Sequence, residues 1–324
     1  MAEATLTRAA SEYYLSDGAD ASVSAGEVWL LPSGEVGVYP AGKPAVSSGA
    51  KIVYETTGKF TFPKSTSTAL LAGGRAYWDV SASNVTYKAV NDGDYFLGLV
   101  VEDVVAADAQ VVVDINKKPQ YKIDLQTSPF NSILAGTPAA GGFGYPVRLG
   151  GRYVLELTAT NEVQKVDLLS VDGFDLSANP IVEAIFSILS DGSNATQDFT
   201  IGVASGTHAT DFQSVTSFVA CSTVGNSTNI NLQSDNNSAD VAPTDTTYDY
   251  TEGTGVTSLV EVWFDFRDPA DVQCYVNGVL SLTATTFTAG TSGTHYLIAH
   301  LEKTTGTDVY KVGVDHLCAR VMEQ

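Results

Sequence analysis

The chain has 324 residues and a net charge of −20 at pH 7, and 44% of its residues are hydrophobic. This length allows two domains, and this apolar fraction is large enough for real cores. No stretch approaches about 18 uninterrupted apolar residues, which excludes a transmembrane helix. The N-terminus lacks the basic start and the apolar run of a signal peptide, so we expect a soluble protein made in the cytoplasm.

The acidic excess is distributed unevenly along the chain. Residues 1–150 carry 11 Lys and Arg against 15 Asp and Glu, a net charge of −4. Residues 151–324 carry 6 against 22, a net charge of −16. A strongly negative half repels phosphate backbones, which argues against binding to nucleic acid. The nearly balanced first half is therefore the better candidate for docking on another protein.

Three cysteines, Cys221, Cys274 and Cys318, lie far apart in the sequence. An odd number at wide spacing does not predict a disulfide framework, and none has the Cys-x-x-Cys partner of a zinc site. We expect all three to be small buried hydrophobic side chains.

Short β-type runs separated by turn residues follow a small, polar N-terminal segment. Residues 1–20 are expected to form an extended or disordered arm, and the pattern up to about Ile115 predicts a compact β-barrel. The predicted strands are Val28–Leu31, Gly37–Tyr39, Lys51–Tyr54, Lys59–Phe62, Ala76–Val80, Val85–Lys88 and Tyr95–Glu102. Two lysines and a proline within Asn116–Pro119 mark a domain boundary. The sequence predicts at most one short turn of helix, at Ser128–Leu134.

Longer strands with alternating apolar and polar residues follow this boundary. Alternation of period two places one face of a strand in a core and the other in solvent. The predicted core positions are Tyr153, Leu155, Leu157, Ala159, Val260, Val262, Phe264, Phe266, Tyr310, Val312 and Val314. Asn277-Gly278 lies between two β runs and tolerates the positive φ of a type I′ hairpin turn. An all-β protein follows, in which a small barrel precedes a larger antiparallel sandwich or jelly roll.

The segment GKFTFPKSTSTALLAGGRAYWD (Gly58–Asp79), a short strand and then GDYFLGLVVEDV (Gly93–Val104) resemble a known family. These are the small capsid cement or decoration proteins of tailed phages, in which a Phe-x-Phe/Leu-Pro-Lys hairpin leads to a Tyr-Trp-Asp strand. The preceding VYPAGKPAVSSGAKIVYET is similar to the family's opening. The resemblance covers about residues 20–115 and implies a barrel of the β-tulip type.

The resemblance also implies a partner and an assembly. It suggests docking on the major capsid protein at the outside of the head, as a homotrimer at three-fold or quasi-three-fold positions. The candidate residues of the capsid or trimer interface are Phe60, Phe62, Pro63, Lys64, Tyr77 and Trp78. The last two are adjacent and point to opposite faces of a strand, so one is expected in the core and the other at a rim or interface.

These expectations divide the chain into three parts. Residues 1–20 form an arm that becomes ordered on the capsid. Residues 21–116 form the docking domain, and residues 117–324 form a sandwich that faces outward. The virion's outer surface is the expected location, after synthesis in the host cytoplasm.

The second half offers two candidate binding features. The runs Glu261–Leu282 and Val309–Val321 resemble concanavalin and laminin-G-like sandwiches, many of which bind glycans. Glu261, Trp263 and Asp265 share one strand face and form a candidate glycan face, with a plain solvated face as the alternative. Asp235, Asn237 and Asp240 lie in an oxygen-rich loop that is a candidate for calcium, with an ordinary turn as the alternative.

Motifs of enzymes are absent from the sequence. It contains no HExxH, nucleophile elbow or Walker loop, and a sandwich glycosidase needs a second glutamate beside Glu261 and Asp265. His295 and His300 are five residues apart, which places them on opposite faces of an ideal strand. We therefore expect a structural protein without a cofactor. A carbohydrate-binding phage adhesin that recognises host-surface glycans remains an alternative, as does a tail-fibre or baseplate module.

Overall fold

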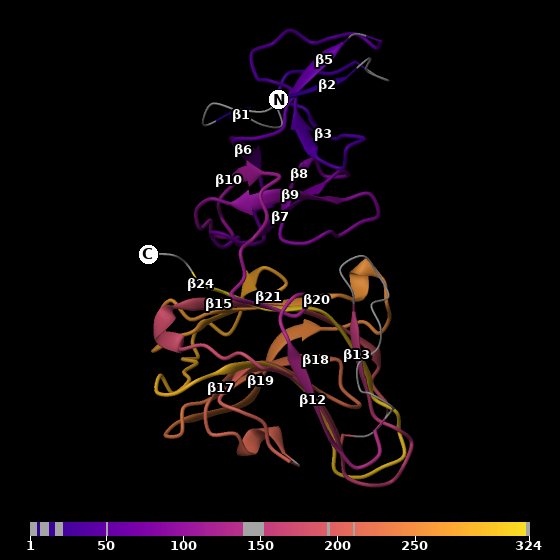
Figure 1. Cartoon of the computed structure of the whole chain (residues 1–324), viewed down its shortest axis with the longest axis vertical. Helices are drawn as coiled ribbons and strands as arrows, with labels where there is room; N and C mark the ends of the chain where they lie inside the picture. The colour runs from indigo at the N-terminus through magenta and orange to yellow at the C-terminus, as the bar shows by residue number, and fades with distance from the viewer. Residues whose placement is uncertain are drawn as a thin grey trace. The chain divides into compact units, whose positions relative to one another are not determined.

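The computed structural model in Figure 1 describes residues 5–6, 13–16, 22–49, 51–138, 152–192, 195–209 and 211–321. The chain divides into two compact units, Met1–Pro119 and Gln120–Gln324. Strands dominate both units, which confirms the all-β class. The helices of the described residues are 3-10 turns at Leu176–Ala178, Phe212–Ser214 and Val256–Ser258. None of the described helices is long and apolar enough to cross a membrane.

The N-terminal unit contains two antiparallel sheets. The larger has the order β1 (Thr5–Leu6), β6 (Lys59–Pro63), β10 (Gln110–Ile115), β9 (Tyr95–Val100), β7 (Arg75–Asp79) and β8 (Asn84–Thr86). The smaller has the order β2 (Tyr13–Ser16), β5 (Ile52–Glu55), β4 (Val36–Val38) and β3 (Val28–Leu30). All seven strands predicted for this region are present, with ends shifted by a few residues. The structure adds β10, which pairs with both β6 and β9.

Two segments of the predicted N-terminal arm are strands of these sheets. β1 pairs with β6, and β2 pairs with β5. The rest of residues 1–20 lies outside the described residues.

The larger sheet curls toward closure, but its ladder does not close in the part of the chain that the structure describes. One parallel bridge joins Lys64 to Val85, and the amide of Ser65 donates to the Val85 carbonyl oxygen over 3.3 Å. A closed barrel needs a continuous ladder between its first and last strands, and the three residues of β8 supply only this bridge. The predicted small barrel is therefore corrected to a curled sheet accompanied by a second, separate sheet.

The motif that carries the family resemblance forms the core of the larger sheet. Phe60 and Phe62 alternate on β6, and the Phe62 ring meets the Trp78 ring edge-on at a centroid distance of 5.9 Å. Gly98 of β9 lies so close to β10 that a Cβ would stand 2.2 Å from the Asp114 carbonyl oxygen. The motif's aromatic residues and its glycine are thus explained by packing.

Asn116 joins the two sheets of the N-terminal unit. Its φ is 60°, and its side-chain oxygen accepts from the amide of Val36 over 2.8 Å. Its side-chain nitrogen donates to the carbonyl oxygens of Val36 and Thr56 over 2.8 and 2.7 Å. The residue that opens the predicted boundary segment is therefore a structural part of the first unit.

The C-terminal unit is a sandwich of two antiparallel sheets of seven strands each (Figure 1). The β24 sheet has the order β11 (Ile123–Asp124), β24 (Lys311–Val321), β15 (Pro180–Ser190), β20 (Val260–Asp265), β21 (Gln273–Val276) and β22 (Val279–Leu280), with β13 (Tyr153–Glu156) also paired to β24. The β23 sheet has the order β12 (Phe130–Ala135), β14 (Gln164–Ser170), β23 (Tyr296–Lys303), β16 (Gln197–Ala204), β17 (Phe218–Val224), β18 (Asn229–Asp235) and β19 (Asp240–Asp249).

The inner faces of these sheets form one hydrophobic core. Nine of the predicted core residues are buried in it: Leu155, Leu157, Val260, Val262, Phe264, Phe266, Tyr310, Val312 and Val314. Asn277 and Gly278 have φ values of 50° and 75° between β21 and β22, which confirms the predicted hairpin. All three cysteines are buried and free, as predicted.

The helical turn predicted at Ser128–Leu134 is wrong. Phe130–Ala135 is the edge strand β12, which pairs with β14 over its whole length. Local propensity is weak in so short a segment, and the ladder to a distant strand overrides it.

Candidate functional site

Four of the six predicted interface residues are buried in the N-terminal unit itself. The exposed fractions of Phe60, Phe62 and Trp78 are 1%, 0% and 3%. Lys64 is also buried, and its ammonium group donates to the carbonyl oxygens of Ser65 and Thr68 over 2.6 and 2.5 Å. Burial lowers the pKa of this amine. These four side chains therefore hold the unit together and do not form its surface.

Pro63 and Tyr77 are half-buried and reach the surface of the N-terminal unit. The Tyr77 ring lies edge-on to the Phe96 ring, with a centroid distance of 5.8 Å. The structure thus separates the adjacent pair as predicted, with Trp78 in the core and Tyr77 at the rim.

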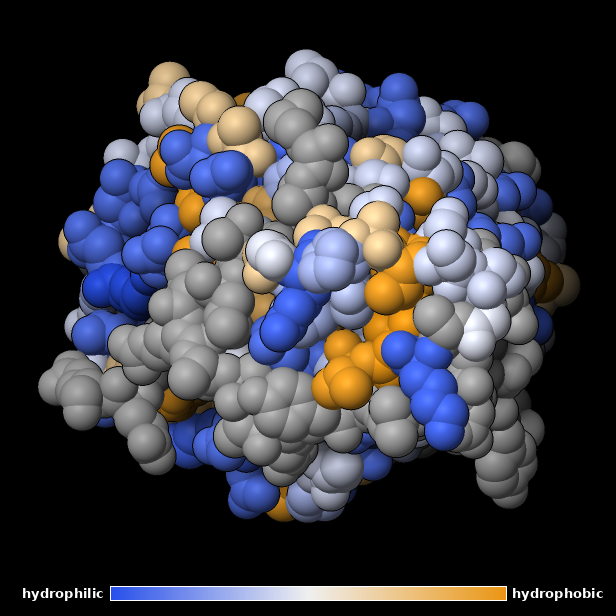
Figure 2. Space-filling view, turned by 90° about the horizontal axis from the view of Figure 1, so that it is seen from above, coloured by the Kyte–Doolittle hydropathy of each residue, from blue (hydrophilic) through white to orange (hydrophobic). Residues whose placement is uncertain are grey.

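Apolar side chains outside the predicted interface set are exposed at the surface of the N-terminal unit. In the N-terminal unit these are Leu30, Val53, Val80 and Val105, and Val105 is the most exposed at 62%. Figure 2 shows apolar residues in a short strip bordered by hydrophilic ones on the face it presents. Leu30 and Val53 lie within β3 and β5, Val80 directly follows β7, and Val105 lies in the loop between β9 and β10. The sequence prediction sought the interface in the family motif and so did not include them. For Val105, an apolar residue in a turn-rich segment is the signal that was available.

The candidate glycan face of the sandwich is buried, which corrects its expected exposure to solvent. Glu261, Trp263 and Asp265 of β20 are only 2%, 6% and 6% exposed. The indole nitrogen of Trp263 donates to a Glu261 carboxylate oxygen over 2.8 Å. The Arg267 guanidinium forms an ion pair with the Asp265 carboxylate, with 2.5 Å between Nη2 and Oδ2. Both carboxylates therefore interact with side chains of nearby residues in the same segment.

The candidate calcium residues Asp235, Asn237 and Asp240 lie at the hairpin between β18 and β19. Asp235 pairs with Asp240 across the ladder, and its side chain accepts from the amide of Asn237 over 2.6 Å. Asn237 has a φ of 66°. The geometry is that of a turn stabilised by its own side chains.

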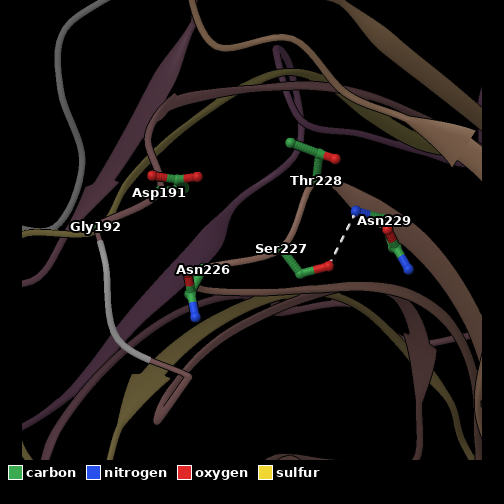
Figure 3. Close-up of a pocket in the computed structure, with 6 residues that line it drawn as sticks. All are labelled: Asp191, Gly192, Asn226, Ser227, Thr228 and Asn229. Atoms are coloured by element: carbon green, nitrogen blue, oxygen red, sulfur yellow. Dashed lines mark hydrogen bonds between the residues drawn. The ribbon is translucent and has the colours of Figure 1, made fainter.

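A polar pocket of about 430 Å³ lies at one end of the sandwich (Figure 3). Its lining residues are Asp191, Gly192, Asn226, Ser227, Thr228 and Asn229. The amide of Asp191 donates to Glu252 over 2.6 Å, and the Tyr250 hydroxyl donates to the Asp191 carboxylate over 3.3 Å. Burial and the Glu252 carboxylate raise the pKa of Asp191. The pocket therefore offers hydroxyl, amide and carboxyl groups.

A buried ionisable network lies on the outer face of the β23 sheet. The ring nitrogens of His300 lie 2.5 Å from Asp167 Oδ1 and 2.8 Å from Glu302 Oε2. Burial by itself lowers the pKa of His300, but the hydrogen bonds to the two carboxylates outweigh it and raise the pKa to about 9. Burial and the nearby Glu302 raise the pKa of Asp198 to about 7. His295 belongs to a separate network and contacts Ser217.

One group of potential metal ligands occurs among the described residues. Ligand atoms of Glu183, His316 and Cys318 lie within 4.8 Å of one another on the β24 sheet. Sequence reasoning treated Cys318 as a buried hydrophobic residue only. The alternation His-x-Cys on one strand is the signal that was available.

Comparison with solved structures finds proteins of low sequence identity and low TM-score. A glycosyl hydrolase family protein from Mycobacterium fortuitum is 13% identical with a TM-score of 0.40, over 62% of this chain and 100% of that chain. The Emp47p carbohydrate recognition domain is 12% identical with a TM-score of 0.39, over 62% of this chain and 94% of that chain. An endo-acting O-glycanase of the human gut microbiota is 12% identical with a TM-score of 0.42, over 63% and 100%. Likenesses this weak carry no argument about this chain.

Comparison of sequences gives a clearer result for the N-terminal unit. No curated protein matches the chain. The family model described as phage cement protein matches residues 15–115. This range covers the segments Gly58–Asp79 and Gly93–Val104, which carry the resemblance in the sequence, together with the strands of the N-terminal unit from β3 to β10. Residues 15–115 of this chain are therefore similar to the phage cement proteins.

Proposed function

We propose that this chain decorates the outside of a tailed-phage head and stabilises the assembled shell. The observation that carries the proposal is the match of residues 15–115 to the phage cement proteins. In this proposal residues 21–116 bind the major capsid protein, and residues 117–324 face outward. The role is structural and requires neither a catalytic residue nor a cofactor.

The surface of the N-terminal unit suits such docking. Val80 and Val105 are more than half exposed, and burying them against a neighbouring protein removes apolar area from water. The charge of residues 1–150 is only −4, so a partner meets little repulsion there, whereas residues 151–324 carry −16. The acidic unit, directed outward, keeps decorated particles apart.

We further propose that the protein acts as a homotrimer at three-fold or quasi-three-fold positions. Three linked docking domains bind a lattice by multivalency, so each contact is allowed to be weak. Clamping neighbouring capsid subunits would oppose the outward pressure of packaged DNA. Mass photometry of the free protein and cryo-electron microscopy of decorated capsids test this assembly, and binding of isolated monomers at other lattice positions would contradict it.

The docking face is tested on capsids that lack this protein. Added full-length protein is expected to bind saturably and to raise the temperature at which the capsids disrupt. Val105→Asp is expected to weaken binding about 10-fold or more, since it places a charge in an apolar contact. Val171→Asp is the matched control, because Val171 is a 46% exposed valine of the C-terminal unit. Absence of saturable binding, or equal effects of both substitutions, would overturn the proposal.

Glycan binding by the sandwich is the second candidate function. The buried Trp263 face does not favour it, but the polar pocket beside Asn226 and Asn229 presents groups that hydrogen-bond sugar hydroxyls. A glycan array probed with the full chain tests this function. Binding that disappears in Asn229→Ala supports the pocket, and a blank array removes this candidate.

A further inference from the structure

The register between β15 and β24 places a glutamate, a histidine and a cysteine on one face of the β24 sheet. His316, Cys318 and Arg320 alternate along β24 and therefore share a face. Glu183 of β15 is the direct partner of Cys318 in the ladder, which places it opposite the middle residue of the three. A β-bulge at Asp315 interrupts the ladder next to His316. Bulges commonly re-aim the side chains beside them.

The atoms that face one another are those that bind metals. His316 Nε2 lies 2.8 Å from Cys318 Sγ and 3.6 Å from Glu183 Oε2. Cys318 Sγ lies 4.0 Å from the same Glu183 oxygen. Glu183 and Cys318 are buried, and the His316 side chain keeps 12% of its surface exposed. The three atoms therefore form a compact triangle with one partly open corner.

The size of this triangle fits a tetrahedral zinc ion. With Zn–S near 2.3 Å and Zn–N or Zn–O near 2.1 Å, neighbouring ligand atoms in a tetrahedron are about 3.4 to 3.6 Å apart. Two of the three distances lie within about half an ångström of these values, and the nitrogen and sulfur must separate by about 0.8 Å. Thiolate, imidazole and carboxylate together favour zinc over calcium or magnesium, which take oxygen ligands only.

Two neighbouring side chains, Arg320 and Tyr121, hold the Glu183 carboxylate in place by hydrogen bonds. Arg320 Nε donates to Glu183 Oε1 over 2.8 Å, which leaves Oε2 directed at His316 and Cys318. The Tyr121 hydroxyl donates to that same Oε2 over 3.1 Å, and its ring lies edge-on to the His316 ring. Ligating carboxylates and imidazoles in proteins are usually held by such partners.

We propose that Glu183, His316 and Cys318 bind one zinc ion on the outer face of the β24 sheet. Water or an external ligand occupies the fourth position at the His316 corner, where the cluster is partly exposed. The site joins β15 to β24 beside the bulge. This inference concerns the C-terminal unit alone and does not depend on the decoration role.

Zinc binding is tested on the full-length protein without an affinity tag. The protein is incubated with excess zinc sulfate, passed into metal-free buffer at pH 7.5 and analysed for metal content. The expected result is about one zinc per chain. Cys318→Ala and His316→Ala are each expected to weaken zinc binding by at least the roughly 10- to 100-fold that loss of an outer-shell partner costs. Cys274→Ala, which removes another buried thiol of the same sheet, is expected to keep the zinc.

A second readout separates ligation from folding. Cobalt substitution of the wild type and of Cys274→Ala is expected to give the thiolate-to-cobalt charge-transfer absorption, and Cys318→Ala is expected to lack it. If Cys318→Ala fails to fold, His316→Ala decides, because it removes only the ring at the exposed corner. A wild-type protein that retains no zinc, or a His316→Ala variant that retains as much as wild type, overturns the proposal.

Discussion

The two units of this protein differ in what lies on the outer faces of their sheets. Among its described residues the N-terminal unit buries three acidic or basic side chains, Glu55, Lys64 and Asp79. The sandwich buries a much larger set: Arg152, Lys165, Asp167, Glu183, Glu261, Asp265, His295, His300, Glu302, Lys303 and Arg320. Most of this set lies on strand faces that an alternating pattern assigns to solvent.

Pairing is what allows the sandwich to bury so much charge. A buried ion costs several kcal/mol unless it is paired and hydrogen-bonded. Arg152 meets Asp315, Arg320 meets Glu183, and His300 lies between Asp167 and Glu302. A strand face that carries polar side chains is therefore not necessarily exposed to solvent. In this sandwich the acidic and basic side chains on such faces form structural ion pairs.

Removal of an aromatic side chain from the N-terminal core should have the largest effect. Phe62 is fully buried and contacts Trp78, so Phe62→Ala is expected to destabilise by about 3–5 kcal/mol through lost burial and a cavity. Hydrogen–deuterium exchange is expected to show lost protection in peptides of Met1–Pro119, together with lost capsid binding. Unchanged protection there would contradict the assignment of Phe62 to the core.

Breaking an ion pair on the outer face of the sandwich is expected to lower the unfolding free energy slightly less than Phe62→Ala does. Arg320→Leu leaves the buried Glu183 carboxylate without its guanidinium partner, and the expected loss is about 3 kcal/mol of unfolding free energy, measured by denaturant titration in zinc-free buffer. The double variant Glu183→Leu/Arg320→Leu removes both charges and is expected to lose less than the single variant. A double variant that is the less stable of the two would show that pairing is not the reason for burial.

The network around His300 predicts a pH-dependent stability. The pKa of Asp198 is raised to about 7 from an ordinary value of 3.8, so its ionisation removes stability as pH rises from about 4 to 7. Asp198→Asn cannot ionise and is expected to be more stable than wild type by about 2 kcal/mol at pH 8, with the difference vanishing near pH 4. Thermal unfolding across this range measures it, and a difference that is constant with pH would contradict the explanation.

His300 contributes in the same direction over a higher range. Its pKa is raised to about 9 in the folded state, so the stability from its protonated form is complete below about pH 6 and is lost as pH rises through 9.

The smallest effect is expected at a turn. Asn277 adopts a φ of 50° and accepts from the amide of Glu261 over 3.2 Å. Asn277→Ala is expected to cost about 1 kcal/mol, from positive φ without an Asn side chain and from the lost hydrogen bond. Asn277→Gly is the control, because glycine adopts this conformation freely. An alanine variant as stable as the glycine variant would show that the turn geometry is unimportant.

Local chemistry in the sequence determined many of the strands of this protein and the inner faces of those strands. Alternation placed Val262 and Phe264 in the core, and Asn277-Gly278 specified its hairpin, because period-two geometry and positive φ are properties of a few neighbouring residues. The segments Gly58–Asp79 and Gly93–Val104 indicated the resemblance to phage cement proteins, and the family model matches residues 15–115. The contact between Phe62 and Trp78 gives a packing reason for part of that motif.

Only the tertiary structure decided what the outer faces do. Glu183 and Arg320 are 137 residues apart in sequence, and Asn116 bonds to Val36 across 80 residues. Ladder register sets such contacts, and no local pattern encodes register between distant strands. For the same reason the sequence indicated neither the open edge of the first sheet nor the burial of Trp263. The cluster of Glu183, His316 and Cys318 likewise becomes visible only when β15 lies against β24.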